Sequence, residues 1–227
     1  MDKTQLKRHD YVFLTQQGRK NVLRRVTQEI SNKEALTAAE QILTGVTEIP
    51  GIVRRNELLI QNAIAVGFVY HQRFSGNRIR IGSYIHADEI KYITSVYDVI
   101  KYRNSQRTAC MRTVEKIKQL ALKYELAIGV LGSAGMELVT GMPYTDECSD
   151  IDILLKPSTY SILCEFYKQA RSINPQINMD FELDLPNGYG VKLAEVFMDT
   201  GTVLGKSIKD VTLLSKKELM NLLTKEK

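Results

Sequence analysis

The 227-residue chain has no tryptophan and few cysteines, histidines and prolines, with three, three and five of each. The cysteines show no C-x-x-C spacing, which excludes a disulfide framework and a cysteine-based zinc site. No apolar run comes near the ~20 residues that a membrane-spanning helix needs. The polar start MDKTQLKRHD does not resemble a secretory signal. We therefore expect a cytoplasmic protein with no membrane partner.

Positive charge exceeds negative charge, with a formal net charge of +5 and a pI near 9. Such an excess favours an anionic partner. Basic residues gather in the first half of the chain, where Arg54, Arg55 and Arg73 could contact phosphates or an acidic protein. For any single pair of basic residues, a solvated surface is the preferred explanation. No nucleic-acid-binding motif accompanies the charge, so nucleic acid is not the partner we expect.

The first half of the chain is predicted to be mainly β. Strands are predicted from Gly51 to Ile85, where Ala63–Tyr70 is rich in β-forming residues and Ser75–Asn77 offers a turn. One helix is predicted at 31–44, beginning with the capping-box spacing Ser31 to Glu34. A linker near residue 104 then separates an N-terminal domain, 1–104, from the rest.

The second half, 105–227, alternates between helix and strand periodicity. Helices are predicted at 107–125, 134–140, 158–171 and from 215 onward, and strands at 127–131, 151–155, 177–185 and 189–197. The whole chain is therefore predicted to have an α+β fold, with a mainly β first half followed by an α/β second half.

Two aspartates one residue apart mark the candidate site. Side chains alternate between the two faces of a strand, so Asp150 and Asp152 lie on one face while Ile151 and Ile153 reach the core. Two such carboxylates repel each other unless a cation lies between them, which favours a hard divalent ion. The alternative is an Asp-x-Asp that only faces water.

A third carboxylate is expected from the predicted strand 177–185. Asp180 and Glu182 there also alternate with apolar residues. We favour Asp180, although the spacing alone does not separate it from Glu182.

Gly132 and Ser133 lie between an apolar strand and a short predicted helix. A Gly-Ser turn at a helix N-terminus lets backbone N–H groups and a hydroxyl approach a phosphate closely. A phosphate-binding turn followed by a metal-binding Asp-x-Asp strand resembles the active site of the nucleotidyltransferase superfamily. In that superfamily two metal ions neutralise the attacking and leaving oxygens. The resemblance implies two Mg²⁺ ions, with Asp150 and Asp152 as ligands.

The stretch GSAGMELVTGMPYTDECSDIDILL at 132–155 resembles a narrower family, the malonate decarboxylase holo-acyl-carrier-protein synthases, also called phosphoribosyl-dephospho-CoA transferases. Their pattern is Gly-Ser, a Leu-Thr-Gly-Leu-Pro-Tyr-like stretch, then Ser-Asp-Leu-Asp-Leu-Leu. Similarity extends over nearly the whole chain, including RHDYVFL, PGIVRR, AVGFVYHQRF and MDFELDLPNGYGVKLAEVF. The chain departs from the family where a tryptophan usually follows the Gly-Ser. Gly135-Met136 stands there instead, so a stacking role for that aromatic does not carry over.

The resemblance implies a specific activity. The 2'-(5''-phosphoribosyl)-3'-dephospho-CoA group would pass from its triphosphate precursor to a serine of the acyl-carrier subunit of malonate decarboxylase, with release of diphosphate. Asp150 and Asp152 would hold Mg²⁺, and Asp180 would complete the metal site or take the serine proton. Gly132 and Ser133 would hold the β- and γ-phosphates.

Other basic residues complete the expected substrate site. Lys206 is a candidate for contact with the departing diphosphate, although an ordinary surface lysine explains it equally well. Arg54, Arg55 and Arg73 would bind the triphosphate or an acidic carrier. The resemblance thus implies a substrate- or carrier-binding domain at 1–104 and a nucleotidyltransferase-like catalytic domain with a mixed sheet at 105–227.

Three alternatives remain. The chain could be a close relative acting on another carrier protein. It could also be a nucleotidyltransferase that uses ATP to modify a small molecule, a protein or RNA. A non-catalytic module that binds polyanions is the third.

Overall fold

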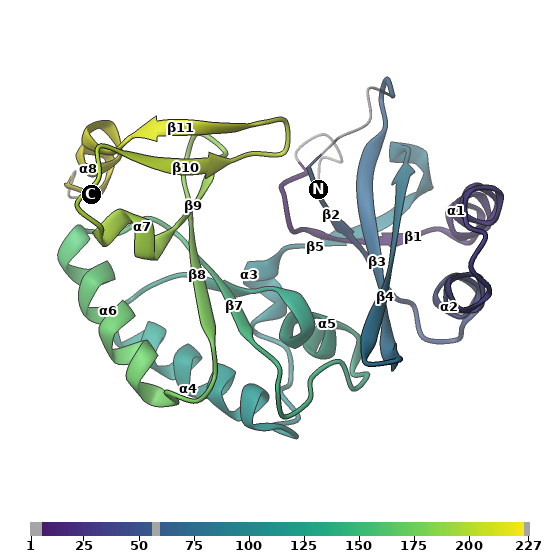
Figure 1. Cartoon of the computed structure of the whole chain (residues 1–227), viewed down its shortest axis with the longest axis horizontal. Coiled ribbons are helices and arrows are strands. Elements are labelled where there is room, and N and C mark those ends of the chain that lie inside the picture. Colours follow the sequence, from purple (N-terminus) through teal and green to yellow (C-terminus); the bar gives the residue numbers. More distant parts are fainter. Residues whose placement is uncertain (1–5, 56–59, 225–227) are drawn as a thin grey trace. The chain divides into compact units, whose positions relative to one another are not determined.

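The computed structural model describes residues 6–55 and 60–224. It has 39% helix and 28% strand, which confirms the predicted α+β class. The chain forms two compact units, Met1–Ser95 and Val96–Lys227, each with its own sheet (Figure 1). The functions expected of domains 1–104 and 105–227 stay predictions.

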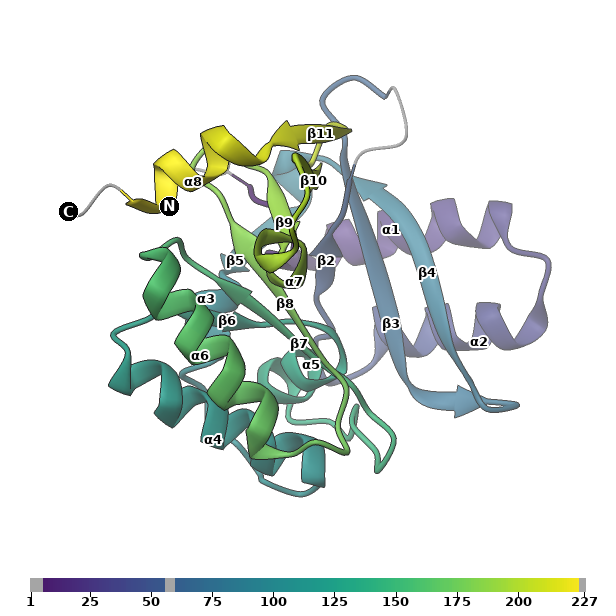
Figure 2. The same cartoon turned by 60° about the vertical axis from the view of Figure 1, so that its left-hand side comes forward.

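The first unit contains a five-stranded antiparallel sheet in the order β4-β3-β2-β1-β5. In β3, Val66, Phe68 and Tyr70 point to one side and are buried. Two helices pack together beside this sheet and cover that side (Figure 2). The elements are β1 Tyr11–Leu14, α1 Gln16–Glu29, α2 Lys33–Thr44, β2 Gly51–Val53, β3 Ile64–Phe74, β4 Asn77–Ile85, the 3₁₀ turn η1 Ala87–Glu89 and β5 Ile90–Thr94.

The strands predicted from 51 to 85 are confirmed at 51–53, 64–74 and 77–85, as is the turn, while residues 56–59 lie outside the described part of the chain. Strands β3 and β4 form a hairpin joined by Ser75 and Gly76, which have φ of 49° and 80°. Positive φ at both central residues is the geometry that suits the twist of a two-residue hairpin turn.

The helix predicted at 31–44 is confirmed, but the capping box at Ser31 is wrong. The helix begins at Lys33, and the side chain of Asn32 accepts a hydrogen bond from the backbone N–H of Ala35 at 3.0 Å. Asparagine caps a helix as well as serine does, so the start moves by one residue. Helix α1 was not expected, because Val22 and Val26 are its only buried large apolar residues and its periodicity is weak.

The second unit contains a six-stranded mixed sheet in the order β11-β10-β9-β8-β7-β6. Only β7 and β8 run parallel, and the other neighbours are antiparallel. The elements are α3 Val96–Val99, α4 Ala109–Lys123, β6 Ile128–Val130, α5 Gly132–Thr140, β7 Ile151–Leu155, α6 Tyr160–Ile173, β8 Met179–Asp184, β9 Gly190–Lys192, α7 Leu193–Phe197, β10 Thr202–Lys206, β11 Val211–Ser215 and α8 Lys216–Thr224.

Helices α4 and α6 lie side by side on one face of this sheet (Figures 1 and 2). Their apolar stripes include Met111 and Ile117 of α4 and Phe166 of α6, which are fully buried. The ring of Phe166 meets that of Phe181 in β8 edge to face, with centroids 5.9 Å apart. This packing buries one face of β7 and β8 and leaves the alternate side chains for the opposite face.

The strand predicted at 189–197 is wrong for its second half, because Leu193–Phe197 form α7. Leu193 and Val196 are three residues apart and both buried, which is helical spacing rather than alternation. The β10–β11 hairpin that follows was not expected from the sequence. No helix is long and apolar enough to cross a membrane in the part of the chain that the structure describes.

Candidate active site

The pairing of β7 with β8 brings two predicted site residues together. The strands are parallel, and Asp152 lies directly opposite Asp180. Neighbouring strands are ~4.8 Å apart, so the two side chains leave adjacent positions on the same face. Glu182 instead lies opposite Leu154, two residues further along the strands. The register therefore puts Asp180, rather than Glu182, beside Asp152, and its chemical role stays a prediction.

Asp150 comes immediately before β7, and it is exposed whereas Asp152 is partly buried. The thiol of Cys110 in α4 donates to the backbone carbonyl of Asp150 at 3.7 Å. Burial and the neighbouring charges of Glu137 and Asp152 raise the pKa of this thiol to about 12. Cys110 is therefore a neutral donor at physiological pH, and it helps to hold the backbone at Asp150.

Gly132 lies against the carboxylate of Asp152. Its φ of +60° belongs to the left-handed region, and a Cβ atom there would be 2.5 Å from Oδ2 of Asp152. Only glycine fits both the backbone angle and the space. The structure thus brings the first residue of the Gly-Ser turn to Asp152.

Ser133 follows Gly132 in the first turn of α5. The residue before the helix is Leu131, whose side chain has no hydrogen-bond acceptor, so it does not cap the first N–H groups. The positive end of the helix therefore faces the region next to the aspartates without a side-chain cap from Leu131.

Lys192 belongs to the same face and was not singled out from the sequence. It ends β9 opposite Glu182, and its Nζ lies 3.0 Å from Oδ2 of Asp180. The hydrogen bond and the charge of Asp180 raise the pKa of Lys192, with smaller contributions from Glu195 and Asp152. The sequence signal that could have identified Lys192 is its position between the apolar residues Val191 and Leu193, shortly after an acidic strand.

The carboxylate of Asp184, at the other end of β8, has different partners. Asp184 accepts a hydrogen bond from Tyr97 Oη at 2.9 Å and pairs with the ammonium group of Lys156. That ammonium group also lies 4.5 Å from the centre of the Tyr97 ring. Asp184 therefore belongs to a cluster with Lys156 and Tyr97.

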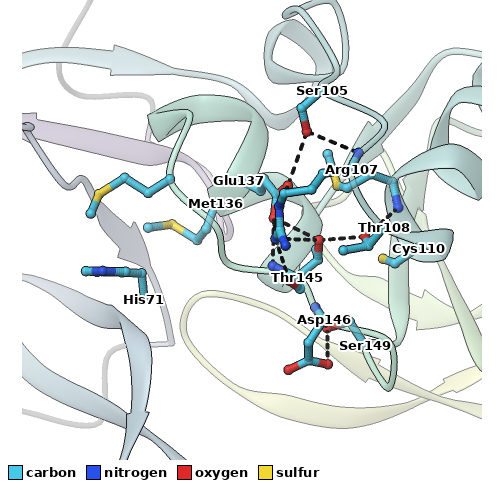
Figure 3. A network of polar contacts seen from close by, with 12 residues as sticks. His71, Ser105, Arg107, Thr108, Cys110, Met136, Glu137, Thr145, Asp146 and Ser149 are labelled. Carbon is cyan, nitrogen blue, oxygen red and sulfur yellow. Dashed lines mark hydrogen bonds and ion pairs between the residues drawn. The ribbon is translucent and has the colours of Figure 1, made fainter.

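A polar network holds the segment between α5 and β7 (Figure 3). Glu137 of α5 is buried, and its carboxylate accepts hydrogen bonds from the backbone N–H and the hydroxyl of Thr145, each at 2.7 Å. Arg107, just before α4, donates to the same carboxylate at 2.9 Å and to the carbonyl of Thr145 at 2.5 Å. The hydroxyls of Thr145 and Thr108 are 2.8 Å apart.

This network fixes the charge of Glu137. Burial alone would raise the pKa of its carboxyl, but the hydrogen bonds from Arg107 and Thr145 outweigh it and the pKa is lowered. Four residues after Thr145, Ser149 closes a tight turn by bonding Asp146 through its backbone and its hydroxyl. Asp150 follows directly, so the network and this turn immediately precede β7. The sequence reasoning missed both Glu137 and Arg107.

The carboxylates suit Mg²⁺ better than a metal that needs a complete protein cage. Within residues 6–55 and 60–224, no group of three His, Cys, Asp or Glu side chains is arranged to hold a metal ion. Mg²⁺ commonly uses one or two carboxylates and takes its remaining ligands from water and substrate phosphates. The Asp152 carboxylate lies beside the N-terminus of α5, and Asp150 is two residues earlier in the chain, so the two would form such a donor set.

Lys206 lies elsewhere on the face. In β10 it is opposite Gly190, which is in turn opposite Asp184. Asp184 and Asp180 are four positions apart in β8, or ~13 Å of strand. The structure therefore does not bring Lys206 to Asp152 and Asp180. The contact of Lys206 with diphosphate stays a prediction.

The three arginines belong to the first unit. The side chain of Arg54 extends over Gly67 of β3 and Gly82 of β4, where a Cβ at Gly82 would be 3.1 Å from its Nη1. Arg73 is exposed and donates to the carbonyl of Gly76 at 3.2 Å. Arg55 is partly buried. Their contact with phosphates or with a carrier stays a prediction.

Comparison with known proteins identifies the family. Residues 98–217 match the family described as "Phosphoribosyl-dephospho-CoA transferase MdcG C-terminal domain". A protein described as phosphoribosyl-dephospho-CoA transferase, from Bradyrhizobium diazoefficiens, is 23% identical over 216 residues, covering 94% of this chain and 92% of that protein. No solved structure gives a significant match. The family match spans more than half of the chain and contains the Gly-Ser turn and every carboxylate of the site. The chain therefore belongs to the MdcG family of phosphoribosyl-dephospho-CoA transferases.

Proposed function

We propose that this transferase moves the 2'-(5''-phosphoribosyl)-3'-dephospho-CoA group from its triphosphate precursor to a serine of the acyl-carrier subunit of malonate decarboxylase, releasing diphosphate. Membership of the family supports transfer of the prosthetic group. The observation that carries the proposed site is the carboxylate of Asp152 lying against Gly132 and beside Asp180. Those residues lie within the segment that matches the family.

The proposed reaction is an in-line displacement at the α-phosphorus of the precursor. The serine Oγ forms a bond to that phosphorus, while the bond from phosphorus to the oxygen of the β-phosphate breaks. The serine proton passes to a base, and diphosphate leaves. The product is a phosphodiester between the carrier serine and the 5''-oxygen of the ribose.

Asp150 and Asp152 would hold Mg²⁺, which supplies Lewis-acid stabilisation of the charge on the transferring phosphoryl group. Asp180 stands next to Asp152 and is the proposed acceptor of the serine proton or a further ligand. Lys192, held at Asp180, adds a positive charge on the same face, where it would balance the phosphates.

Gly132 and Ser133 would hold the β- and γ-phosphates. Backbone N–H groups at the start of α5 are donors for phosphate oxygens, and the helix dipole favours negative charge there. The Ser133 hydroxyl would add a further donor. A glycine without a side chain lets the phosphates approach the backbone beside Asp152.

The substitution Asp152→Asn tests the proposal. Purified carrier subunit with an unmodified serine is incubated with the triphosphate precursor and Mg²⁺, and the mass of the carrier is followed over time. Removing a charge that acts on the transferring phosphoryl group should slow transfer by at least about 10²-fold. Asp98→Asn is the control, because Asp98 is exposed and pairs only with Lys101 among the ion pairs described. It should retain wild-type transfer.

The alternatives predict other results. An ATP-using nucleotidyltransferase would add a labelled nucleotide to its acceptor without the CoA derivative. A polyanion-binding module would show no transfer, and its binding would survive Asp152→Asn. Full transfer by Asp152→Asn would contradict the proposed site.

A further inference from the structure

The β10–β11 hairpin exposes apolar side chains on the face that carries the aspartates. Leu204 of β10 lies opposite Leu213 of β11, and Val211 lies opposite Lys206. Leu204, Val211 and Leu213 are 37%, 40% and 67% exposed. Residues opposite each other in an antiparallel pair point to the same side, so these three form one surface, the hairpin patch. Three exposed aliphatic side chains together indicate an interaction site.

The hairpin patch shares its face with the carboxylates. Gly205 pairs with Val191, whose side chain is buried, so Leu204 and Lys192 point to the opposite, exposed side. Lys192 reaches Asp180, and Asp180 lies beside Asp152. Four strand spacings separate β11 from β7, or ~19 Å across the sheet. A partner bound at the hairpin patch can therefore present a residue to the aspartates without leaving this face.

Lysines lie in and beside the hairpin patch, and the carboxylate of Glu195 accepts a hydrogen bond from the backbone N–H of Leu204 at 3.0 Å. Lys206 lies within it, and the exposed Lys209 belongs to the turn that joins the two strands. Asp210, the nearest carboxylate in that turn, accepts hydrogen bonds from the hydroxyls of Ser207 and Tyr189. An acidic partner would gain from the lysines, whereas a second copy related by two-fold symmetry would bring the same lysines against each other.

We propose that the hairpin patch is the docking surface for the acidic carrier protein that receives the prosthetic group. This inference rests on the proposed function and adds the surface by which the protein partner is recognised. Leu204 and Leu213 contact apolar side chains of the carrier, and the flanking lysines contact its carboxylates. The carrier serine then lies over the row that ends in Asp180 and Asp152.

The substitution Leu213→Glu tests the docking surface, with Leu122→Glu as its matched control. Leu122 in α4 is 64% exposed, close to the 67% of Leu213, but belongs to the helical side of the sheet. Dissociation constants are measured by titration calorimetry with a carrier whose acceptor serine is replaced by alanine, so no chemistry intervenes. Leu213→Glu should weaken carrier binding at least about tenfold, as loss of a central contact does. Leu122→Glu should stay within about twofold of the unsubstituted enzyme.

Transfer assays with the reactive carrier give the second readout. Leu213→Glu should raise the KM for the carrier and leave the KM for the triphosphate precursor unchanged. Lys209→Glu should lower the rate constant for carrier association and reduce its dependence on salt. Equal carrier binding by Leu213→Glu and Leu122→Glu would overturn the docking surface, even if the unsubstituted enzyme modifies the carrier. Absence of transfer by the unsubstituted enzyme would instead overturn the proposed function.

Discussion

At the scale of single residues, Gly132 is the position that the site geometry constrains most. It needs a left-handed backbone angle, and it leaves room for the carboxylate of Asp152. Gly141, at the other end of α5, has a similar φ of +70° but nothing within 4 Å of a Cβ built there. Substituting each glycine therefore distinguishes the effect of backbone strain, which both positions share, from the effect of contact with Asp152, which only Gly132 has.

We predict that Gly132→Ala and Gly141→Ala differ in activity more than in stability. Each should lose about 1–2 kcal/mol from the free energy of unfolding, the cost of placing an L-residue in the left-handed region. Only Gly132→Ala must also displace Asp152, so it alone should lower kcat at least about tenfold. Urea unfolding and carrier modification measure the two quantities. Equal kcat values for the two variants would argue against a role for the Gly132–Asp152 contact.

At the scale of elements, the segment joining α5 to β7 depends on a single carboxylate. Glu137 bonds both the backbone and the side chain of Thr145, and Arg107 ties the same group to the start of α4. The segment that follows carries Asp150 to the edge of β7. A positioning role for Glu137 follows, since it contacts no proposed substrate atom.

Glu137→Ala should lower both stability and kcat, because it leaves the buried N–H of Thr145 without its acceptor and removes the carboxylate that pairs with Arg107. An unsatisfied buried donor costs about 1–3 kcal/mol. Thermal unfolding gives the stability, and the KM for the precursor should rise together with the fall in kcat. Glu165→Ala removes an exposed carboxylate of α6 that accepts only from Gln169 among the hydrogen bonds described, and should change neither. Loss of stability with unchanged kinetics would show that the network supports the fold alone.

At the scale of the whole molecule, each unit contains a buried glutamate with a lowered pKa. In the first unit, burial opposes ionisation of Glu89, but hydrogen bonds from Arg25, the backbone of His86 and Asn21 prevail. In the second unit, Glu137 behaves in the same way. A carboxyl whose pKa is lower in the folded than in the unfolded state stabilises the fold above its unfolded pKa.

Stability should therefore fall as the pH drops below about 4.5, the ordinary pKa of both carboxyls. Below that pH the carboxyls of the unfolded chain bind protons first. The stabilisation from Glu89 and Glu137 is then lost as the pH falls through their lower pKa values in the folded state. Urea unfolding at a series of pH values measures this slope. Glu89→Gln combined with Glu137→Gln should flatten it between pH 5 and 3, roughly the span in which carboxyls titrate. An unchanged slope in the double variant would assign acid sensitivity to other groups.

The sequence alone determined the local features of the site and most elements of the second unit. Alternation in Ser149–Leu155 separated Asp150 and Asp152 from the buried isoleucines, and the Gly-Ser turn was found at the start of a helix. The fold class and the family also followed from the sequence, because strand periodicity and motif spacing are local patterns. The weakly periodic helix α1 and the short helix α7 were missed for the same reason.

Only the tertiary structure decided which side chains meet. Alternation gives the face of a residue but not its neighbour, so the choice between Asp180 and Glu182 beside Asp152 needed the register of β7 and β8. The pairing of Lys192 with Asp180, and that of Arg107 with Glu137, join residues 12 and 30 positions apart. Such contacts depend on how strands and helices pack, since packing brings together residues that no local pattern relates.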